Sequence, residues 1–239
     1  MKKKLCIFTI FFVVFILTTL FVYQNSALSL QELKIIDAVQ TILKDVPLSI
    51  AKFITAFGHE QNWFYAVVTA IVILLISKKY KEAIFYIIAI RLSTFLYSFA
   101  KDIIARPRPP MDMRLIEVSN TSYPSGHSTT SMVTYGLLVY FVYRHVKNKI
   151  LRNTLIALLS ILILLVGFSR VWVGVHFPTD VIGGFSLGIC IICIFAIINE
   201  IKLPFTKWNN FFILGLFRFI CSNIVLLCST IYQINYKKL

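Results

Sequence analysis

The sequence predicts an all-α protein, a polytopic bundle of membrane helices built as a single domain over residues 1–239. Hydrophobic residues make up 58% of the chain and charged residues only 14%, whereas soluble domains carry about 25% charged residues. Several apolar runs approach or exceed the roughly 17 to 25 residues that cross a bilayer as helix. Lysines gather in short clusters between these runs, as in cytoplasmic loops. We expect six core transmembrane helices, with a seventh C-terminal span as a further possibility.

The first predicted span is Leu5–Tyr23, which follows three lysines at the start of the chain. It is too long for the core of a signal peptide and lacks a convincing cleavage site. We therefore expect a retained helix with a cytoplasmic N-terminus, and a cleaved leader is the alternative.

The next stretch, Gln24–Asn62, is mixed rather than uniformly apolar. Ser29 and Glu32 fit a capping box at a helix start, and apolar residues then recur at helical spacing from Leu33 to Val46. This pattern predicts either a helix lying in the outer membrane interface or an amphipathic helix packed on the bundle.

Five further core spans follow, each an apolar run of helical length. Their approximate bounds are Trp63–Ser77, Ala83–Ala100, Ser128–Tyr143, Ile150–Phe168 and Val181–Asn199. Counting crossings from a cytoplasmic N-terminus places the basic turns at 78–81 and 144–152 inside, as the positive-inside rule requires. The last apolar run, 211–232, is expected to be a seventh span, and a hairpin or an interfacial helix is the alternative.

The last core span carries small residues for which we expect no chemistry. Cys190 and Cys193 form a C-x-x-C pattern, but their apolar surroundings are typical of a lipid-facing helix rather than a redox loop. Gly183, Gly184 and Gly188 favour close packing against a neighbouring helix.

The net charge of +14 does not indicate nucleic-acid binding, because no basic face is interleaved with aromatic residues in a soluble segment. An anionic lipid surface or an anionic substrate accounts for the charge better. No cluster with metal-ligand spacing and no glycine-rich phosphate loop is present in the sequence.

Three short stretches carry residues suited to phosphoryl transfer. They are KDIIARPRPP at Lys101–Pro110, YPSGHS at Tyr123–Ser128 and SRVWVGVHFPTD at Ser169–Asp180. The predicted crossings place all three on the outer side of the membrane, so we expect them to form one site.

Each stretch supplies a different part of that chemistry. Lys101, Arg108 and Arg170 are cations that can hold the negative oxygens of a phosphate ester before it reacts. Ser125 and Gly126 precede a predicted helix, whose first backbone N–H groups form an anion site. His176 and Asp180 are one helical turn apart, so the carboxylate can orient the imidazole as in a catalytic triad.

The complete set of motifs resembles the type 2 phosphatidic acid phosphatase superfamily, which also includes glucose-6-phosphatases and vanadium haloperoxidases. That family's pattern is K-x6-R-P, then P-S-G-H, then S-R-x5-H-x3-D, and the resemblance covers roughly residues 45–200. The matching positions are Lys101, Arg108, Pro109, Pro124 to His127, Ser169, Arg170, His176 and Asp180. The family's spacing selects Arg108 and leaves Arg106 a supporting or surface role.

The resemblance implies a role for each of these residues. His176 would attack phosphorus to form a phosphohistidine, His127 would donate a proton to the leaving oxygen, and no metal or cofactor would be needed. Asp180 would orient His176. The residues expected to bind the substrate phosphate are Lys101, Arg108, Ser125, Gly126 and Arg170.

The expected function is a metal-independent hydrolase of a lipid phosphate or diphosphate at the outer face of the plasma membrane. Undecaprenyl diphosphate is preferred because its product is released on that face, and phosphatidylglycerophosphate or phosphatidate is the alternative. Haloperoxidases of the family are largely soluble, which counts against that activity. A non-catalytic lipid-binding or transport protein would be expected to lack a histidine or the aspartate. The oligomeric state is not predicted.

Overall fold

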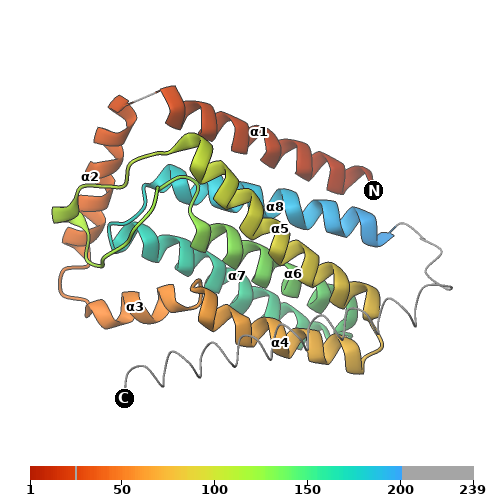
Figure 1. Ribbon diagram of the computed structural model, residues 1–239. Helices are drawn as coiled ribbons and strands as arrows, with labels where there is room; N and C mark the ends of the chain where they lie inside the picture. Colours follow the sequence, from red (N-terminus) through yellow and green to blue (C-terminus); the bar gives the residue numbers. More distant parts are fainter. Residues whose placement is uncertain (25, 201–239) are drawn as a thin grey trace, which may run out of the picture. The chain divides into compact units, whose positions relative to one another are not determined.

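The computed structural model of the protein describes residues 1–24 and 26–200, which form eight α-helices, one short 3₁₀ helix and no strand (Figure 1). The all-α prediction is confirmed for this part of the chain. The helices are α1 (Lys2–Gln24), α2 (Ser26–Ile42), α3 (Leu48–Ala56), α4 (Glu60–Ile76), α5 (Tyr80–Ile104), α6 (Gly126–His145), α7 (Lys149–Trp172) and α8 (Pro178–Glu200).

Each of the six predicted core spans coincides with one of these helices, to within a few residues at either end. Among the described residues, the helices α1, α5, α7 and α8 are long and apolar enough to cross a membrane. Their outer surfaces carry exposed large apolar side chains such as Leu17 and Leu158, a pattern expected for helices surrounded by lipid. The protein is therefore a multi-pass membrane protein.

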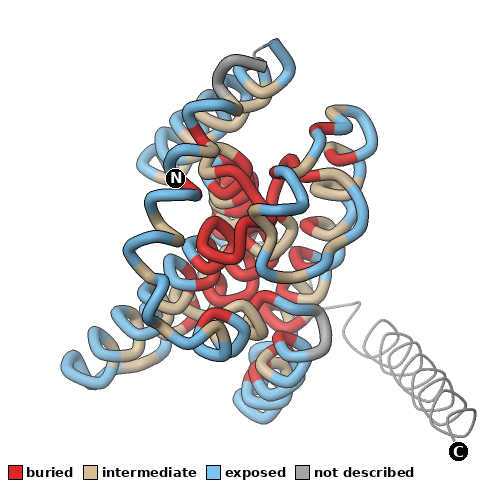
Figure 2. The backbone as a smooth tube through the Cα atoms, turned by 90° about the vertical axis from the view of Figure 1, so that its left-hand side faces the viewer, coloured by how far each residue is buried: buried red, intermediate tan, exposed pale blue. Residues whose placement is uncertain are grey.

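Helix α6 lies in the middle of the bundle, where it packs against α5, α7 and α8. Its first turns are rich in serine and threonine. The hydroxyls of Thr129, Thr130 and Ser131 donate to carbonyls one turn earlier, as Thr130 Oγ1 does to Gly126 O at 2.7 Å. Because neighbouring helices shield α6 from lipid, it does not need an apolar surface. Figure 2 shows this buried centre in red, surrounded by exposed residues.

Helix α8 packs closely against α6 through its glycines, as the sequence predicts. A Cβ atom on Gly184 would lie 2.7 Å from the carbonyl oxygen of Ser125, and one on Gly183 would meet the ring of Tyr123. The prediction that the neighbouring thiols face lipid is wrong, because Cys190 and Cys193 are both buried. Cys190 lies against α1, which runs beside α8.

Helices α2 and α3 pack over the turn that joins α7 to α8, at one end of the bundle (Figure 1). Ile36 of α2 is fully buried against Val171 and Phe177, so α2 is the packed amphipathic helix of the two alternatives. The predicted capping box is wrong, since α2 begins at Ser26 and Ser29 lies inside the helix. Glu32 instead contacts residues of other elements, as described below.

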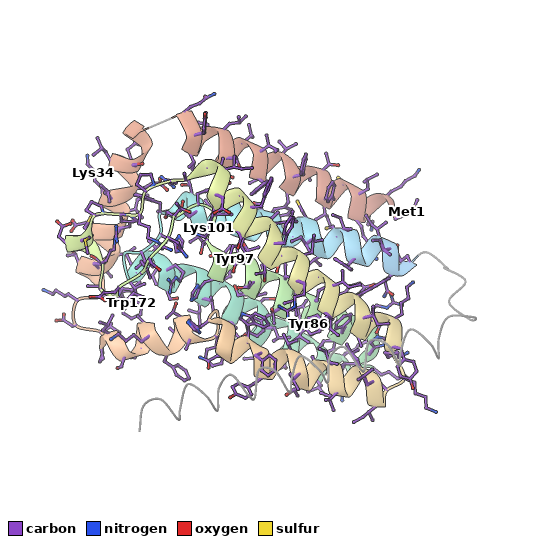
Figure 3. All side chains as sticks on the ribbon, viewed as in Figure 1. Met1, Lys34, Tyr86, Tyr97, Lys101 and Trp172 are labelled. Carbon is purple, nitrogen blue, oxygen red and sulfur yellow. The ribbon has the colours of Figure 1, made fainter. Side chains whose placement is uncertain are left out.

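The two ends of the bundle differ in their chemistry. The basic turns at 78–79 and 146–148 lie at the same end as the N-terminus (Figure 1). There the buried carboxylate of Glu82 is 2.7 Å from His145 Nε2. Figure 3 shows that Lys101 and Trp172 lie at the opposite end from Met1.

The C-terminal span expected at 211–232 lies outside the described residues, and the single-domain assignment stays a prediction.

We expect Gly184→Ala to lower the free energy of unfolding by about 1–3 kcal/mol, the usual cost of an overpacked site. The added methyl group would meet the backbone of Ser125, which cannot rotate away. Thermal unfolding in detergent measures the effect. Gly136→Ala is the matched control, because its methyl group would come too close to the flexible end of Ile192 and would make an ordinary contact with Met132 Sδ at 3.6 Å. Equal stability of the two variants would contradict this packing argument.

Candidate active site

His176 and Asp180 form a buried pair at the junction of α7 and α8. His176 Nδ1 lies 3.2 Å from Asp180 Oδ2, and the side chains of both residues are almost fully buried. Pro178 is the first helical residue, a position that suits its fixed φ angle. The carboxylate of Asp180 therefore lies in the first turn and reaches back to accept a hydrogen bond from the N–H of Phe177 at 2.9 Å.

The hydrogen bonds of His176 define which ring nitrogen carries the proton. Arg108 Nη1 lies 3.3 Å from His176 Nε2, and because a guanidinium can only donate, Nε2 is the unprotonated nitrogen. Nδ1 then donates to Asp180. Burial first, and then the charges of Arg170 and Arg108, lower the pKa of His176 to about 3, although Asp180 acts in the opposite direction. The imidazole is therefore neutral at physiological pH.

Ser122 also binds this pair. Its hydroxyl donates a short hydrogen bond to Asp180 Oδ2 and lies 3.3 Å from His176 Nδ1. Asp180 Oδ1 accepts from Arg106 Nη1 at 2.6 Å. Both oxygens of the Asp180 carboxylate therefore accept hydrogen bonds, as a buried charge requires.

Three predicted cations lie near His176, and neutral hydrogen-bond acceptors hold each of them in place. Lys101 has three ammonium N–H donors, and it donates to the carbonyls of Thr121 and Ser122. Arg108 Nη1 donates to Val175 O at 2.7 Å. Burial lowers the pKa of Arg108 to about 10, so it stays charged at neutral pH.

Arg170 is the third of these cations. It is buried and donates from Nη1 to Thr55 Oγ1 at 2.5 Å. Its Nε has no hydrogen-bond partner within the described part of the chain. A buried donor of this kind is expected to meet an anion or water in the working protein.

A cavity of about 570 Å³ opens between these groups. The predicted site residues that line it are Lys101, Arg108, Gly126, His127, Arg170 and His176. Figure 3 shows Lys101 and Tyr97, another lining residue, on the same helix at this end of the bundle. The structure therefore brings the three sequence stretches to one cavity.

The start of α6 borders the same cavity. Ser125 is the N-cap, and its side-chain oxygen accepts from the N–H and the hydroxyl of Ser128. Ser125 is buried and does not line the cavity, whereas Gly126 and His127 do. In this structure the side chain of Ser125 caps α6, and its expected contact with the substrate phosphate stays a prediction. His127 faces His59, with ring centroids 6.1 Å apart.

Several residues of this site were not found from the sequence. Asn120 holds Arg108 through its backbone and side-chain oxygens, and Lys52 and His59 line the cavity from the α3–α4 region. Ser122 binds Asp180, although it lies outside the motifs. Nothing in the local sequence pattern marks these residues, because each acts through a contact made by folding.

Comparison with known proteins places these motifs in a family. A family model described as the PAP2 superfamily matches residues 82–203, about half of the chain. A 90-residue segment is 40% identical to phosphatidylglycerophosphatase B of Bacillus subtilis (strain 168), covering 37% of this chain and 44% of that protein. A 141-residue segment is 31% identical to an undecaprenyl-diphosphatase of Sulfolobus acidocaldarius, covering 57% of this chain and 63% of that protein.

A solved structure is also similar to this chain. The crystal structure of a transmembrane PAP2-type phosphatidylglycerolphosphate phosphatase from Bacillus subtilis superposes with a TM-score of 0.73 at 25% identity. The match covers 86% of this chain and all of that one. The sequence alignments, by contrast, span less than two thirds of the length of each of the two relatives.

We expect the imidazole of His176 to show no titration between about pH 5 and 8, the range in which an ordinary histidine changes charge. Its lowered pKa keeps it neutral as the pH falls through that range. NMR of the protein labelled with ¹⁵N in its four histidines measures this, with His176→Asn used to assign the signal. A midpoint near 6.5 for that signal would contradict the burial argument.

Proposed function

The chain belongs to the PAP2 superfamily, and from this premise we propose that it is a membrane lipid phosphatase acting through a phosphohistidine intermediate. One observation carries the proposal. The unprotonated Nε2 of His176 faces a cavity lined by Lys101, Arg108 and Arg170, while Asp180 holds the other ring nitrogen. A neutral nucleophile behind a ring of cations is suited to attack a phosphate.

The reaction has two steps. In the first, His176 Nε2 forms a bond to phosphorus, the bond from phosphorus to the leaving oxygen breaks, and His127 gives that oxygen a proton. In the second, water attacks phosphorus, the P–N bond breaks, and His127 takes the proton of the water. Asp180 stabilises the positive charge that His176 gains in the first step.

The proposed mechanism requires no metal ion. Lys101, Arg108 and Arg170 supply the positive charge that a metal would otherwise bring to the phosphate oxygens. The described residues contain no group of three or more His, Cys, Asp or Glu side chains placed to hold a metal. Turnover in the presence of EDTA tests the requirement directly.

We propose that six helices cross the membrane and that the cavity opens at the outer face. Lys101, which lines the cavity, lies at the opposite end of the bundle from Met1 (Figure 3). The basic turns at the N-terminal end favour a cytoplasmic location for that end. A lipid substrate would then keep its chains in the bilayer and place its phosphate among the cations at the outer boundary.

Undecaprenyl diphosphate is the first proposed substrate. The cavity lining also includes Lys52 of α3 and one carboxylate, Glu117. The lining cations outnumber that carboxylate, and a diphosphate carries more negative charge than a monoester. Phosphatidylglycerophosphate is the second candidate, since the relative that is 40% identical is named a phosphatidylglycerophosphatase. Both substrates are lipids that would present a terminal phosphate to the same cations.

We expect His176→Ala and His127→Ala each to abolish phosphate release from a lipid diphosphate, while both variants still fold and insert. The first removes the nucleophile and the second removes the proton donor. Phosphate release by purified enzyme in detergent measures the loss, and EDTA should leave the wild-type rate unchanged. His145→Gln is the matched control, because His145 is the last residue of α6, which ends at the same end of the bundle as the N-terminus (Figure 1). Full activity in His176→Ala, or loss of wild-type activity with EDTA, would refute the mechanism.

We expect kcat/KM to be higher for undecaprenyl diphosphate than for phosphatidylglycerophosphate or phosphatidate, because the diphosphate meets more of the cations that line the cavity. The three substrates are compared with the same purified enzyme in the same detergent. Lys52→Ala should reduce the preference for the diphosphate. A higher kcat/KM for phosphatidylglycerophosphate would make that lipid the substrate without changing the proposed mechanism.

A further inference from the structure

We propose that Glu32 and Arg106 are positioning residues for the catalytic pair, through a buried chain of charges that runs from α2 to His176. The chain is Glu32, Arg106, Asp180 and His176. The inference rests on the proposed function, because it concerns how Asp180 holds His176 for attack. Neither Glu32 nor Arg106 lines the cavity, so both act behind the reacting groups.

Arg106 bridges two carboxylates. Its Nη1 donates to Asp180 Oδ1 and its Nη2 to Glu32 Oε2, each at 2.6 Å. The guanidinium lies over the ring of Phe177, with its carbon 3.9 Å from the ring centroid. Nη1 also donates to Thr179 Oγ1 at 2.8 Å and Nη2 to Ser29 Oγ at 3.3 Å. The side chain is only 5% exposed, so these partners determine its plane and its position.

Glu32 connects the same arginine to the start of α8. Its Oε1 accepts from the N–H of Thr179 at 2.8 Å and from the Thr179 hydroxyl at 2.7 Å. The N–H groups of a first helical turn lack partners within their own helix. Glu32 thus caps α8 from a different helix, one residue before Asp180.

These contacts determine where the carboxylate of Asp180 can lie. Arg106 holds Oδ1, so Oδ2 is left to accept from His176 Nδ1, Ser122 and the backbone of Phe177. The rotation of the carboxylate, and with it the direction of His176 Nε2, depends on Arg106 and therefore on Glu32. Without Glu32, Arg106 would lose one of its two anions and α8 would lose its cap.

The charges also suit the reaction. Glu32 and Asp180 are negative and Arg106 is positive, so the chain carries one net negative charge behind a neutral His176. When the P–N bond forms, the imidazole gains positive charge, and this surplus negative charge stabilises it. The chain therefore affects the chemical step more than the binding of the substrate.

The test compares Glu32→Gln and Arg106→Lys with the wild type on a lipid diphosphate. We expect kcat to fall by about 10- to 100-fold, by analogy with the loss of an outer partner of a metal-binding histidine, with KM unchanged. Inhibition by inorganic phosphate should also stay unchanged, because the lining cations are not altered. A purely structural role would lower the amount of folded protein and leave kcat per folded molecule as it was.

Glu82→Gln is the matched control. Glu82 is also a buried carboxylate, with Arg144 Nε at 4.0 Å and His145 Nε2 at 2.7 Å from its oxygens. It lies in the first turn of α5, which begins at the same end of the bundle as the N-terminus (Figure 1). We expect Glu82→Gln to affect thermal stability only. Glu32→Asp keeps the charge and should recover part of the kcat lost in Glu32→Gln.

The outcomes separate this inference from the proposed function. If the wild type releases phosphate and His176→Ala does not, but folded Glu32→Gln retains the wild-type kcat, this inference alone is overturned. If Glu32→Gln does not fold, Arg106→Lys decides in the same way. If His176→Ala remains active, the proposed function fails first.

Discussion

The buried carboxylate of Asp180 is the constraint on which the rest of the site depends. A fully buried charge is costly unless it is paired and each of its oxygens is satisfied. Asp180 meets this requirement through Arg106, Ser122, His176 and the N–H of Phe177. These donors come from the loop after α5, the segment before α6 and the start of α8. Satisfying one carboxylate therefore brings three separate parts of the chain together.

The contrast between Arg106 and Arg108 explains how neighbouring cations of one motif differ in role. Arg106 is neutralised by two carboxylates, so it has no charge to offer a substrate. Arg108 is held mainly by oxygens of Asn120 and Val175, which satisfy its donors without cancelling its charge. The same is true of Lys101 with its two carbonyls. The cavity thus retains positive charge that an anionic substrate can neutralise.

The sequence predicts the helices and the lining of the site well because both are local properties. Apolar runs give the spans to within a few residues, and three motifs give six residues that line the cavity. Glu32 could not be assigned in this way: its spacing from Ser29 fits a capping box, yet it binds Thr179, which is 147 residues further along the chain. Ser125 differs from the other motif residues: it belongs to the P-S-G-H motif, but its side chain caps α6 and does not line the cavity.

Cationic side chains at this end of the bundle donate hydrogen bonds to backbone carbonyls of its non-helical segments. Backbone carbonyls outside helices need donors, and membrane proteins tolerate such backbone where it is covered by protein or lines a cavity. The carbonyl of Thr121 accepts from Lys101, that of Val175 from Arg108 and that of Pro109 from Arg114. Cations placed in this way keep their charge, whereas acidic partners would have removed it. In the proposed mechanism, the irregular backbone therefore orders these cations before an anionic substrate arrives.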